Sequence, residues 1–407
     1  LAAGLAGLAL LVLALGAGLL ALLRPAPDEW SMPLRLGPWQ QPLSVPALLR
    51  IGTHPLVLRA LDGRTLATRF GAIEWHAGDR SAGADHWRAV CAPCRLQWRE
   101  LGDEPLVLAR VELLAHRPTP DQWTGEFVLG DAPHAVRGRF RAGFGRQGAT
   151  IDLDLPDTPI ADAYGLFAGL MPEVRQARIE GRLRLQARWR WPQRELVLRP
   201  QIDGFVVQGL HTEALLGAKP ACAAPPARGF GTWLPRAVVA AEDQRFYEHS
   251  GYDLREMSAA WSDGRSDARG ASTLSQQLAR LLYAGHEHNQ LRKLRELLYA
   301  VELDRTLGKA RVLDLYLSIA PWGEGRCGAT EAARHYLHKR VDRLTPTEAA
   351  WLASLLHSPQ RDWNEFTRSG EVNVRRVGWV IEHLRPMPPR QRAALVDALP
   401  GWSPPRP

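Results

Sequence analysis

Hydrophobic and polar positions alternate with a period of two in the first half of the chain. Runs of this kind lie at residues 109–114, 125–129, 149–155 and 179–191, and Gly, Pro and Asp punctuate them. Alternation between such breakers is typical of antiparallel strands that have one solvated face. Residues 24–215 are therefore predicted to form a β-rich module.

The period changes to that of helices from Trp233 onward. The stretch before it, residues 216–231, is rich in Ala, Pro and Gly and is predicted to be a linker. Residues 232–385 are predicted to form a helical domain, followed by a tail at 386–407. The class is therefore α+β, with strands and helices segregated along the chain.

Two capping boxes indicate helix starts within the helical domain. Thr273 is followed by Gln276, and Thr345 by Pro346 and Glu348. A threonine that precedes a Gln or Glu by three residues satisfies the first backbone N–H groups of a helix. The second of these segments is expected to end near residues 358–359.

Residues 1–23 contain no charged side chain and consist of Leu, Ala, Gly and Val. A helix of this length crosses a hydrocarbon core of about 30 Å. The exit at Leu22, Leu23, Arg24 and Pro25 is a poor small-x-small cleavage site, so we expect a retained transmembrane anchor rather than a signal peptide.

The composition of the chain limits which classes of partner it could bind. The chain of 407 residues is 45% hydrophobic, enough for a substantial core and two domains besides the anchor. Its formal charge of +8 suits a membrane surface, a pyrophosphate or a nucleic acid. The sequence contains no recognisable nucleic-acid-binding module, so nucleic acid is not expected as a partner.

The cysteines leave several interpretations open. Cys91 and Cys94 fit a small structural disulfide, a redox pair or half of a zinc site, and the disulfide is favoured because no second Cys-x-x-Cys occurs. A bridge between Cys222 and Cys327 would close a long loop and is left open. Residues 286–288, His-Glu-His, fit a polar loop better than a metal cluster.

Candidate chemistry begins at residues 242–251, Glu-Asp-Gln-Arg-Phe-Tyr-Glu-His-Ser-Gly, which follow an apolar run. The spacing predicts a helix on which Glu242, Phe246 and His249 share one stripe. A carboxylate beside apolar neighbours can be tuned for proton transfer. The simpler interpretation is a solvated helix charge.

Four later segments favour a role in proton transfer for Glu242 over a solvated helix charge. They read Gly-Ala-Ser-Thr-Leu-Ser-Gln-Gln at 270–277, Arg-Lys-Leu-Arg-Glu at 292–296, Lys309 through Tyr316-Leu-Ser, and Gly-Ala-Thr-Glu-Ala-Ala-Arg-His-Tyr-Leu at 328–337. With the first segment, they resemble in order the five motifs of the family 51 peptidoglycan glycosyltransferases. The resemblance covers residues 222–385.

The resemblance says nothing about residues 24–215. Within them, the segment 156–168 and the long strands after it are faintly similar to the β-rich modules of AsmA-like envelope proteins. A lipid- or glycan-contacting role and a structural spacer both remain open for this module.

The resemblance implies a lysozyme-like helical domain that polymerises lipid II into glycan strands and releases undecaprenyl pyrophosphate. It also implies a cytoplasmic-membrane protein whose catalytic domain lies on the periplasmic side, with lipid II, the growing strand and other cell-wall synthesis proteins as partners. Such chemistry requires a base beside the acceptor hydroxyl and positive charge beside the leaving pyrophosphate.

Residue roles follow from the matched motifs. Glu242 is expected to be the base that takes the proton of the acceptor 4-hydroxyl. Glu296, the second key carboxylate, is expected to orient cations or to hold Mg²⁺ or Mn²⁺ near the phosphates. The expected substrate-binding residues are Asp243, Phe246, His249, Thr273, Gln276, Gln277, Arg280, Arg292, Lys293 and Lys309.

Within this set, Asp243 and His249 are expected to hold the turn of the first motif, with Phe246 packed beneath it. Arg292 and Lys293 are expected to contact pyrophosphate. A simpler interpretation of Arg292 and Glu296, four residues apart on a helix face, is a surface ion pair.

The third-motif helix is expected to bury Leu294, Leu298 and Val301. The polar segment 262–269 is a candidate mobile flap over the donor site.

The chain departs from the family pattern at four positions. Arg280-Leu281 stands where Lys-Asn is usual, Ser318 replaces Asn, Ser275 replaces Thr, and Ala271 replaces Gly. Both key carboxylates are kept, so activity is expected.

Two rival functions remain. A lytic transglycosylase or lysozyme-like enzyme also uses a helical Glu, but cleavage of a neutral glycosidic bond needs no clamp for pyrophosphate. A non-catalytic scaffold that docks lipid II is the second rival. No Ser is followed three residues later by Lys, and Lys-Thr-Gly does not occur, so no transpeptidase activity is expected from this sequence.

Overall fold

The computed structural model describes residues 22–36, 39–78, 86–218, 222, 226, 228–257, 272–285 and 289–405. The chain divides into two compact units. The first comprises residues up to Trp98, Asp103–Gly169 and Gly181–Asp203. The second comprises Arg99–Gly102, Leu170–Glu180 and Gly204–Pro407.

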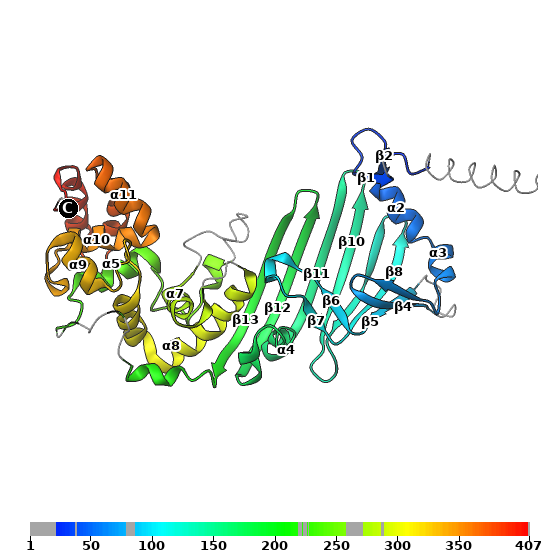
Figure 1. Ribbon diagram of the computed structural model, residues 1–407, viewed down its shortest axis with the longest axis horizontal. Coiled ribbons are helices and arrows are strands. Elements are labelled where there is room, and N and C mark those ends of the chain that lie inside the picture. The colour runs from blue at the N-terminus through cyan, green and yellow to red at the C-terminus, as the bar shows by residue number, and fades with distance from the viewer. Residues whose placement is uncertain are drawn as a thin grey trace, which may run out of the picture. The chain divides into compact units, whose positions relative to one another are not determined.

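The first unit contains a sheet of nine strands in the described part of the chain, in the order β13-β12-β11-β10-β9-β8-β5-β4-β3, except that the start of β12 and the end of β13 belong to the second unit (Figure 1). The strands are β3 (Thr65–Thr68), β4 (Gly71–Ala77), β5 (His86–Cys91), β8 (Val111–Thr119), β9 (Gln122–Leu129), β10 (Val136–Gly145), β11 (Gly148–Pro159), β12 (Arg178–Trp191) and β13 (Glu195–Gln208). Neighbouring strands from β3 to β12 pair antiparallel. The β-rich module predicted from period-two alternation is confirmed as an antiparallel sheet.

Strand β12 shows the physical basis of that prediction. Its burial alternates along the strand, with Arg182, Arg184 and Arg188 exposed and Ala187 buried. On the apolar side of the sheet, buried side chains from α3 and four strands form one cluster. The cluster consists of Leu58, Trp87, Ala115, Trp123 and Ala142.

Smaller elements complete the first unit. They are the strand pairs β1 (Ser31–Leu36) with β2 (Trp39–Ser44) and β6 (Cys94–Leu96) with β7 (Leu106–Leu108), and the helices α2 (Val45–Gly52), α3 (Pro55–Ala60) and α4 (Ile160–Gly165). Cys91 at the end of β5 and Cys94 at the start of β6 form a disulfide, with Cα atoms 5.2 Å apart. The favoured interpretation of this cysteine pair is confirmed.

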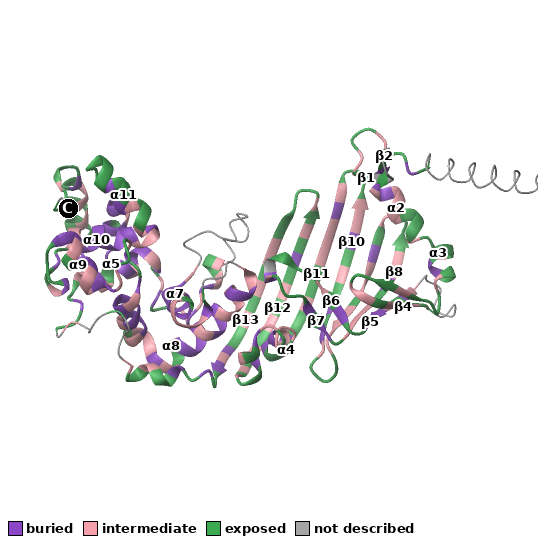
Figure 2. Ribbon diagram, viewed as in Figure 1, coloured by how far each residue is buried: buried purple, intermediate pink, exposed green. Residues whose placement is uncertain are grey.

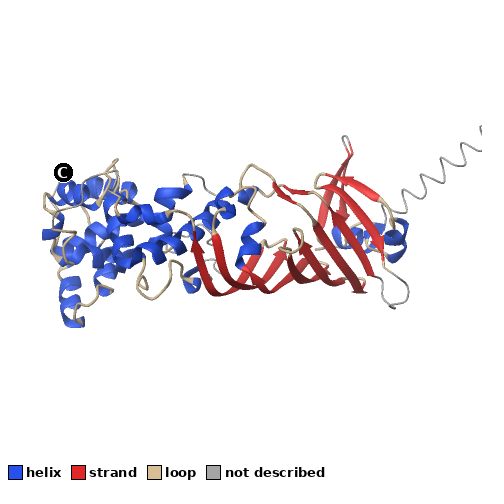
Figure 3. Ribbon diagram, turned by 90° about the horizontal axis from the view of Figure 1, so that it is seen from below, coloured by secondary structure: helices blue, strands red, loops and turns tan. Residues whose placement is uncertain are grey.

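The second unit is helical (Figure 3). Its α-helices are α5 (Trp233–Glu242), α7 (Leu274–Ala279), α8 (Gln290–Ile319), α9 (Ala329–Leu337), α10 (Pro346–Ser354), α11 (Pro359–Ser369), α12 (Val374–Glu382) and α13 (Pro389–Asp397). Short turns of other helix types are η2 (Arg99–Leu101), η3 (Pro172–Arg175), η4 (Thr212–Leu216), the π-helical η5 (Arg280–Ala284), η6 (Val341–Arg343), η7 (Leu355–His357) and η8 (Leu399–Gly401). Buried residues concentrate along α5, α8 and α10 (Figure 2).

Both predicted capping boxes are present. The Thr273 side chain accepts from the Gln276 N–H while the Gln276 side chain accepts from the Thr273 N–H, and Thr345 and Glu348 make the same exchange. These local hydrogen bonds start α7 and α10. The second helix, α10, ends at Ser354, and the 3-10 turn η7 continues to His357, directly before the predicted end near residues 358–359.

Segments from the predicted β-rich stretch belong to the helical unit and pack on α8. The carboxylate of Glu302 on α8 is buried and accepts hydrogen bonds from the Leu210 N–H, the Thr212 N–H and the Thr212 hydroxyl, at 2.9–3.2 Å. Arg295 forms an ion pair with Glu173. Arg311 donates to the carbonyl of Leu215. These contacts attach the chain on either side of β12 and β13 to the helical core.

Cys222 and Cys327 form the second disulfide, with Cα atoms 5.6 Å apart and a sequence separation of 105. The long-loop bridge that the sequence left open is therefore present. It ties the chain that precedes α5 to the turn that precedes α9.

Several predictions fall outside the described residues. Residues 1–21 of the predicted anchor, the candidate flap at 262–269 and the His-Glu-His segment at 286–288 are among them. Among the helices that are described, none combines the length and apolar character needed to cross a bilayer.

Candidate functional site

Glu242 is the last residue of α5, and its helix ends there, so one sequence prediction is wrong. The residues that follow form turns, and Asp243 has an extended φ of −160° instead of a helical one. Glu242, Phe246 and His249 therefore do not share a helical stripe. The physical reason is a long-range bond, because the Asp243 carboxylate accepts the Leu274 N–H at the start of α7, at 2.9 Å. That bond competes with continuation of the helix.

The carboxylate of Glu242 is 12% exposed, so the simpler interpretation as a solvated helix charge is wrong. Its Oε2 accepts a hydrogen bond of 3.1 Å from the Gln277 side chain of α7. Its Oε1 is buried and has no hydrogen-bond partner among the described residues. This oxygen therefore keeps a free lone pair with which it could accept a proton.

Burial raises the pKa of Glu242 above its usual value. The hydrogen bond from Gln277 and the positive charges of Arg376 and Arg280 act in the opposite direction and lower that pKa. The position of Glu242 at the carboxyl end of α5, where the helix dipole is negative, also disfavours its charge. A carboxylate with a raised pKa is a stronger base than an exposed one, which suits a proton acceptor.

A buried tyrosine fixes the amide that holds Glu242. The hydroxyl of Tyr316 on α8 donates to Oε1 of Gln277 at 2.8 Å, so the Gln277 amide nitrogen points toward Glu242. Burial, together with the nearby Glu242 charge, raises the pKa of Tyr316 well above its usual value, so this hydroxyl stays a donor. The three residues form a hydrogen-bonded chain from α8 through α7 to α5.

Arg376 on α12 is a site residue that sequence reasoning missed. Its guanidinium lies 3.6 Å from Oε1 of Glu242 and donates to the carbonyl of Ala241 at 3.2 Å. It also stacks over the Trp379 ring, with 4.9 Å from Cζ to the ring centroid. Arg376 and Ala241 are 135 residues apart in the sequence, and no local pattern connects them.

Asp243 and His249 hold the turn after α5. The His249 ring nitrogen Nε2 lies 3.0 Å from Oδ1 of Asp243, and Lys309 Nζ lies 3.5 Å from the other ring nitrogen. A neutral imidazole that donates from Nε2 and accepts at Nδ1 satisfies both contacts. Phe246 is fully buried beneath the turn, and the Lys309 ammonium lies 4.5 Å from its ring centroid.

A break in α8 at Gly308 determines the position of Lys309. Gly308, directly before it, has a φ of +73°, which only glycine adopts readily. Lys309 forms an ion pair of 2.8 Å with Asp304, and Asp304 also accepts from the Ser275 hydroxyl at 2.9 Å. Lys309 is thus positioned within this hydrogen-bond network. Ser275, one of the departures from the family pattern, contributes to the same network.

The side chains of Thr273 and Gln276 stabilise the start of α7. Both side chains are buried and occupied by the capping box, and the Thr273 hydroxyl also donates to the Gly251 carbonyl at 2.7 Å. Gly251 has a φ of +86°, and an added Cβ would meet the Ala300 carbonyl oxygen at 2.5 Å. The close approach of this turn to α8 thus requires glycine.

Arg292 and Glu296 form a buried ion pair on α8 that the partly exposed Lys293 joins, so the surface ion-pair interpretation is wrong. Glu296 is 1% exposed and forms ion pairs with Arg292, which is 7% exposed, and with Lys293 at 2.9 Å. Lys293 is 32% exposed and also donates to the Ser272 hydroxyl at 2.8 Å. The predicted stripe lies beside it, with Leu298 and Val301 buried and Leu294 half-buried.

Glu296 does not fit a divalent metal ion in this arrangement, because one of its oxygens faces Arg292 and the other Lys293. Within the described residues, no group of three or more acidic, His or Cys side chains could hold a metal ion. The geometry instead supports the expected orienting role, in which Glu296 holds two cations.

Residues 272–277, which include the start of α7, connect Glu242 with Lys293. Ser272, just before the helix, accepts from Lys293, the Leu274 N–H donates to Asp243, and the Gln277 side chain donates to Glu242. Arg280 follows α7 directly, with an exposed side chain whose charge acts on Glu242. The arrangement joins a buried carboxylate to accessible positive charge, as attack on a phosphate-activated sugar would require.

Comparison with known proteins agrees with this geometry. Residues 221–385 match the profile of the family described as Transglycosylase. Over these residues the chain is similar to that family. The match includes α5 through α12 and therefore the site residues around Glu242 and around Glu296.

Three curated relatives that match this part of the chain are each named biosynthetic peptidoglycan transglycosylase. The protein of Nitrosomonas eutropha is 43% identical over 130 residues, which are 31% of this chain and 53% of the relative. That of Xanthomonas campestris pv. campestris is 39% identical over 154 residues, 37% and 62% of the two chains. That of Bordetella pertussis is 40% identical over 149 residues, 35% and 61%. The chain thus spans between half and two thirds of these relatives.

Proposed function

We propose that this chain is a peptidoglycan glycosyltransferase that polymerises lipid II into glycan strands and releases undecaprenyl pyrophosphate. The observation that carries the proposal is the connection made by residues 272–277 between the buried Glu242 carboxylate and the cationic Arg292, Lys293 and Glu296 cluster. The transglycosylase family match and the printed names of the curated relatives support it.

In the proposed reaction, Glu242 removes the proton from the 4-hydroxyl of the acceptor sugar. The resulting oxygen nucleophile attacks the anomeric carbon of the donor, and the bond from that carbon to the pyrophosphate oxygen breaks with inversion. Gln277 and Tyr316 keep the carboxylate oriented while Oε1 receives the proton. Because the base is already held in place, little reorganisation accompanies the transfer.

Negative charge grows on the leaving pyrophosphate in this reaction, and cations near the exposed edge of the site would offset it. Lys293 and Arg280 have the accessible side chains for this task, while Arg292 and Glu296 are buried behind Lys293. Asp243, His249 and Lys309 act as positioning residues that hold the turn after Glu242.

The proposal also places the protein at the cytoplasmic membrane, with residues 1–23 as anchor and the helical unit on the periplasmic side. Lipid II carries a polyprenyl chain, so an enzyme that extends it must work at a bilayer surface. The two disulfides suit a compartment outside the cytoplasm.

Polymerisation of labelled lipid II by the detergent-solubilised chain tests the proposal. We expect glycan strands from the parent protein, loss of nearly all product with Glu242→Gln, and a strong loss with Glu296→Gln. Glu248→Gln is the matched control, because Glu248 is an exposed carboxylate of the same turn and contacts Arg245 alone among described side chains. The absence of strands from a folded parent protein in both Mg²⁺ and Mn²⁺ would refute the proposed activity. Parent-like rates from Glu242→Gln would refute the assigned base.

A further inference from the structure

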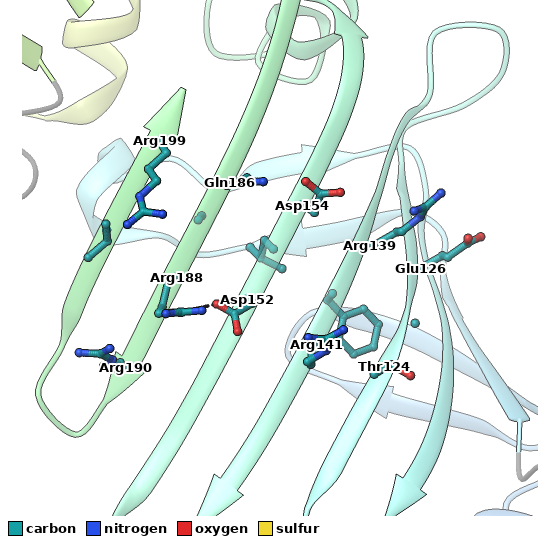
Figure 4. Close-up of a pocket in the computed structure, with 15 residues that line it drawn as sticks. Thr124, Glu126, Arg139, Arg141, Asp152, Asp154, Gln186, Arg188, Arg190 and Arg199 are labelled. Carbon is teal, nitrogen blue, oxygen red and sulfur yellow. Dashed lines mark hydrogen bonds and ion pairs between the residues drawn. The ribbon is translucent and has the colours of Figure 1, made fainter. Parts of the chain in front are cut away.

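The nine-stranded sheet carries a charged groove that the transferase chemistry does not use. The groove has a volume of about 750 Å³ and lies wholly within the first unit (Figure 4). Its polar lining comes from five neighbouring strands, β9 to β13. These side chains are Thr124, Glu126, Arg139, Arg141, Asp152, Asp154, Gln186, Arg188, Arg190 and Arg199.

Strand register places the central side chains on one face. Arg141 of β10 lies opposite Asp152 of β11, which in turn lies opposite Arg188 of β12. Arg139 lies opposite both Asp154 of β11 and Glu126 of β9. Residues directly opposite each other in an antiparallel sheet point to the same side. A row of acidic residues on β11 is therefore flanked by arginines on both neighbouring strands.

Much of this charge has no ionic partner. Arg188 pairs with Asp152 at 2.6 Å, and Arg190 pairs with Glu195 at 3.0 Å. In contrast, three arginines and two acids of the groove make no ion pair or side-chain hydrogen bond with any described residue. These five residues, called the unpaired set below, are Arg139, Arg141, Arg199, Glu126 and Asp154.

Cross-strand charges on a solvated sheet face normally pair with each other. In this groove the arginines at 139 and 141 stand free although acids lie opposite them. A free guanidinium presents a planar fork of donors that fits a carboxylate in two parallel hydrogen bonds. Two such forks on one strand, two residues apart, are spaced about 7 Å along it.

The unpaired set carries both positive and negative charge, and this limits the kinds of ligand that fit the groove. A uniform polyanion would be attracted by the arginines but repelled by Glu126 and Asp154. A ligand with carboxylates and an ammonium group in one extended segment would satisfy both. Short peptides that contain acidic and diamino acids have this chemistry, and in a bacterial wall they are attached to the glycan strand.

We propose that this groove binds the stem peptides of peptidoglycan. The inference rests on the proposed function, because that function brings the chain together with this polymer. The unpaired arginines hold the peptide carboxylates, and Glu126 and Asp154 face its ammonium group. In this proposal the β-rich module binds the peptide part of the polymer, and the helical unit forms its glycan part.

Co-sedimentation of the full chain with purified sacculi tests this. The triple variant Arg139→Gln, Arg141→Gln and Arg199→Gln is expected to bind at least about tenfold more weakly than the parent. The control is the triple variant Arg178→Gln, Arg182→Gln and Arg184→Gln, whose arginines lie outside the groove and pair with Glu180 or Asp157. It removes the same charge and is expected to bind like the parent.

Three further samples separate the possible ligands. Released stem peptides should compete for binding, while glycan strands stripped of peptides by an amidase should not. Equal binding of stripped strands would overturn the proposal. Arginine-dependent binding to phosphatidylglycerol vesicles without competition by peptides would also overturn it, in favour of a lipid surface. Equal loss in both triple variants would show a simple charge effect and would overturn it as well.

Polymerisation of lipid II by the same variants keeps the two proposals separate. The groove arginines are outside the transferase site, so both triple variants should polymerise at the parent rate. Failure of the parent to polymerise would refute the proposed function and leave the sacculus-binding comparison valid. Thermal unfolding of each variant checks that the sheet is intact, and an Arg→Lys triple variant, which keeps charge but not the fork, should recover only part of the binding.

Discussion

The Arg376 guanidinium lies 3.6 Å from Oε1 of Glu242, the oxygen that has no hydrogen-bond partner among the described residues. This separation is too long for a strong bidentate pair, so the arginine attracts the carboxylate without occupying its lone pair. The raised pKa of Glu242 is thus a compromise between burial, which raises it, and positive charge, which lowers it.

Replacing Arg376 should change the pH dependence of glycan polymerisation. Arg376→Gln removes a charge that lowers the pKa of Glu242, so that pKa should rise further. Because the base must be deprotonated to act, the acid limb of the rate profile should move to higher pH. Measurement of initial polymerisation rates across pH checks this.

Two variants serve as controls for that experiment. Arg376→Lys keeps the charge and should restore most of the parent acid limb. Arg375→Gln removes an exposed neighbouring arginine and should leave the profile unchanged. An acid limb that stays in place in Arg376→Gln, despite lower rates, would mean that Arg376 supports the fold and does not act on the carboxylate.

Glu242 should reduce the stability of the folded chain at neutral pH. A carboxyl whose folded pKa lies above its unfolded value binds more protons when folded, so stability is lost as pH rises through the folded pKa. Glu242→Gln should therefore unfold at an equal or higher temperature than the parent at neutral pH. The difference should shrink as pH falls and the parent carboxyl becomes protonated.

Thermal unfolding of both proteins between acid and neutral pH measures this effect. Glu248→Gln, at an exposed position of the same turn, should show no such trend. A parent protein that is more stable than Glu242→Gln at neutral pH would contradict the inferred cost of the buried charge.

Glu302 should be important for the attachment of residues 210–212 to α8. Its buried carboxylate accepts from two backbone N–H groups and one hydroxyl, and Glu302→Ala would leave those donors buried without partners. Each unsatisfied buried group costs roughly 1–3 kcal/mol, so a total loss of roughly 3 kcal/mol or more is expected. Chemical denaturation followed by helical circular dichroism measures it. A loss below about 1 kcal/mol would show that water replaces the carboxylate.

The features that the sequence predicted correctly depend on neighbouring residues. Strand β12 was predictable because its exposed arginines alternate with apolar residues, and the starts of α7 and α10 because a capping box is complete within four residues. The motif residues were found as a set because each motif is short. Local rules of this kind do not depend on the rest of the fold.

The features that were missed depend on distant contacts. The end of α5 at Glu242 reflects the hydrogen bond that the Leu274 N–H donates to the Asp243 carboxylate, and Arg376 donates to the carbonyl of Ala241, 135 residues away in the sequence. In the sequence, Glu302 looks like an ordinary charged residue of a helix, because its contact with the Leu210 N–H exists only in the folded chain. The burial of Arg292 and Glu296 likewise depends on tertiary packing, since an i, i+4 pair reads the same on a surface.

The Cys222 to Cys327 disulfide should contribute most of its stabilisation to the helical unit. It closes a loop of 105 residues that contains α5, α7 and α8, and the chain-entropy model gives about 4–5 kcal/mol for a loop of this length. Cys327→Ser, or a reducing agent, should lower the unfolding temperature of that unit. The paired variant Cys91→Ser and Cys94→Ser breaks a bridge that spans only 3 residues and should affect the helical unit much less. Calorimetry of the parent and both variants, with and without reductant, compares them. If the Cys327 variant unfolds at the parent temperature, the unfolded chain must already be restrained over that loop, and the long bridge then has little effect on folding.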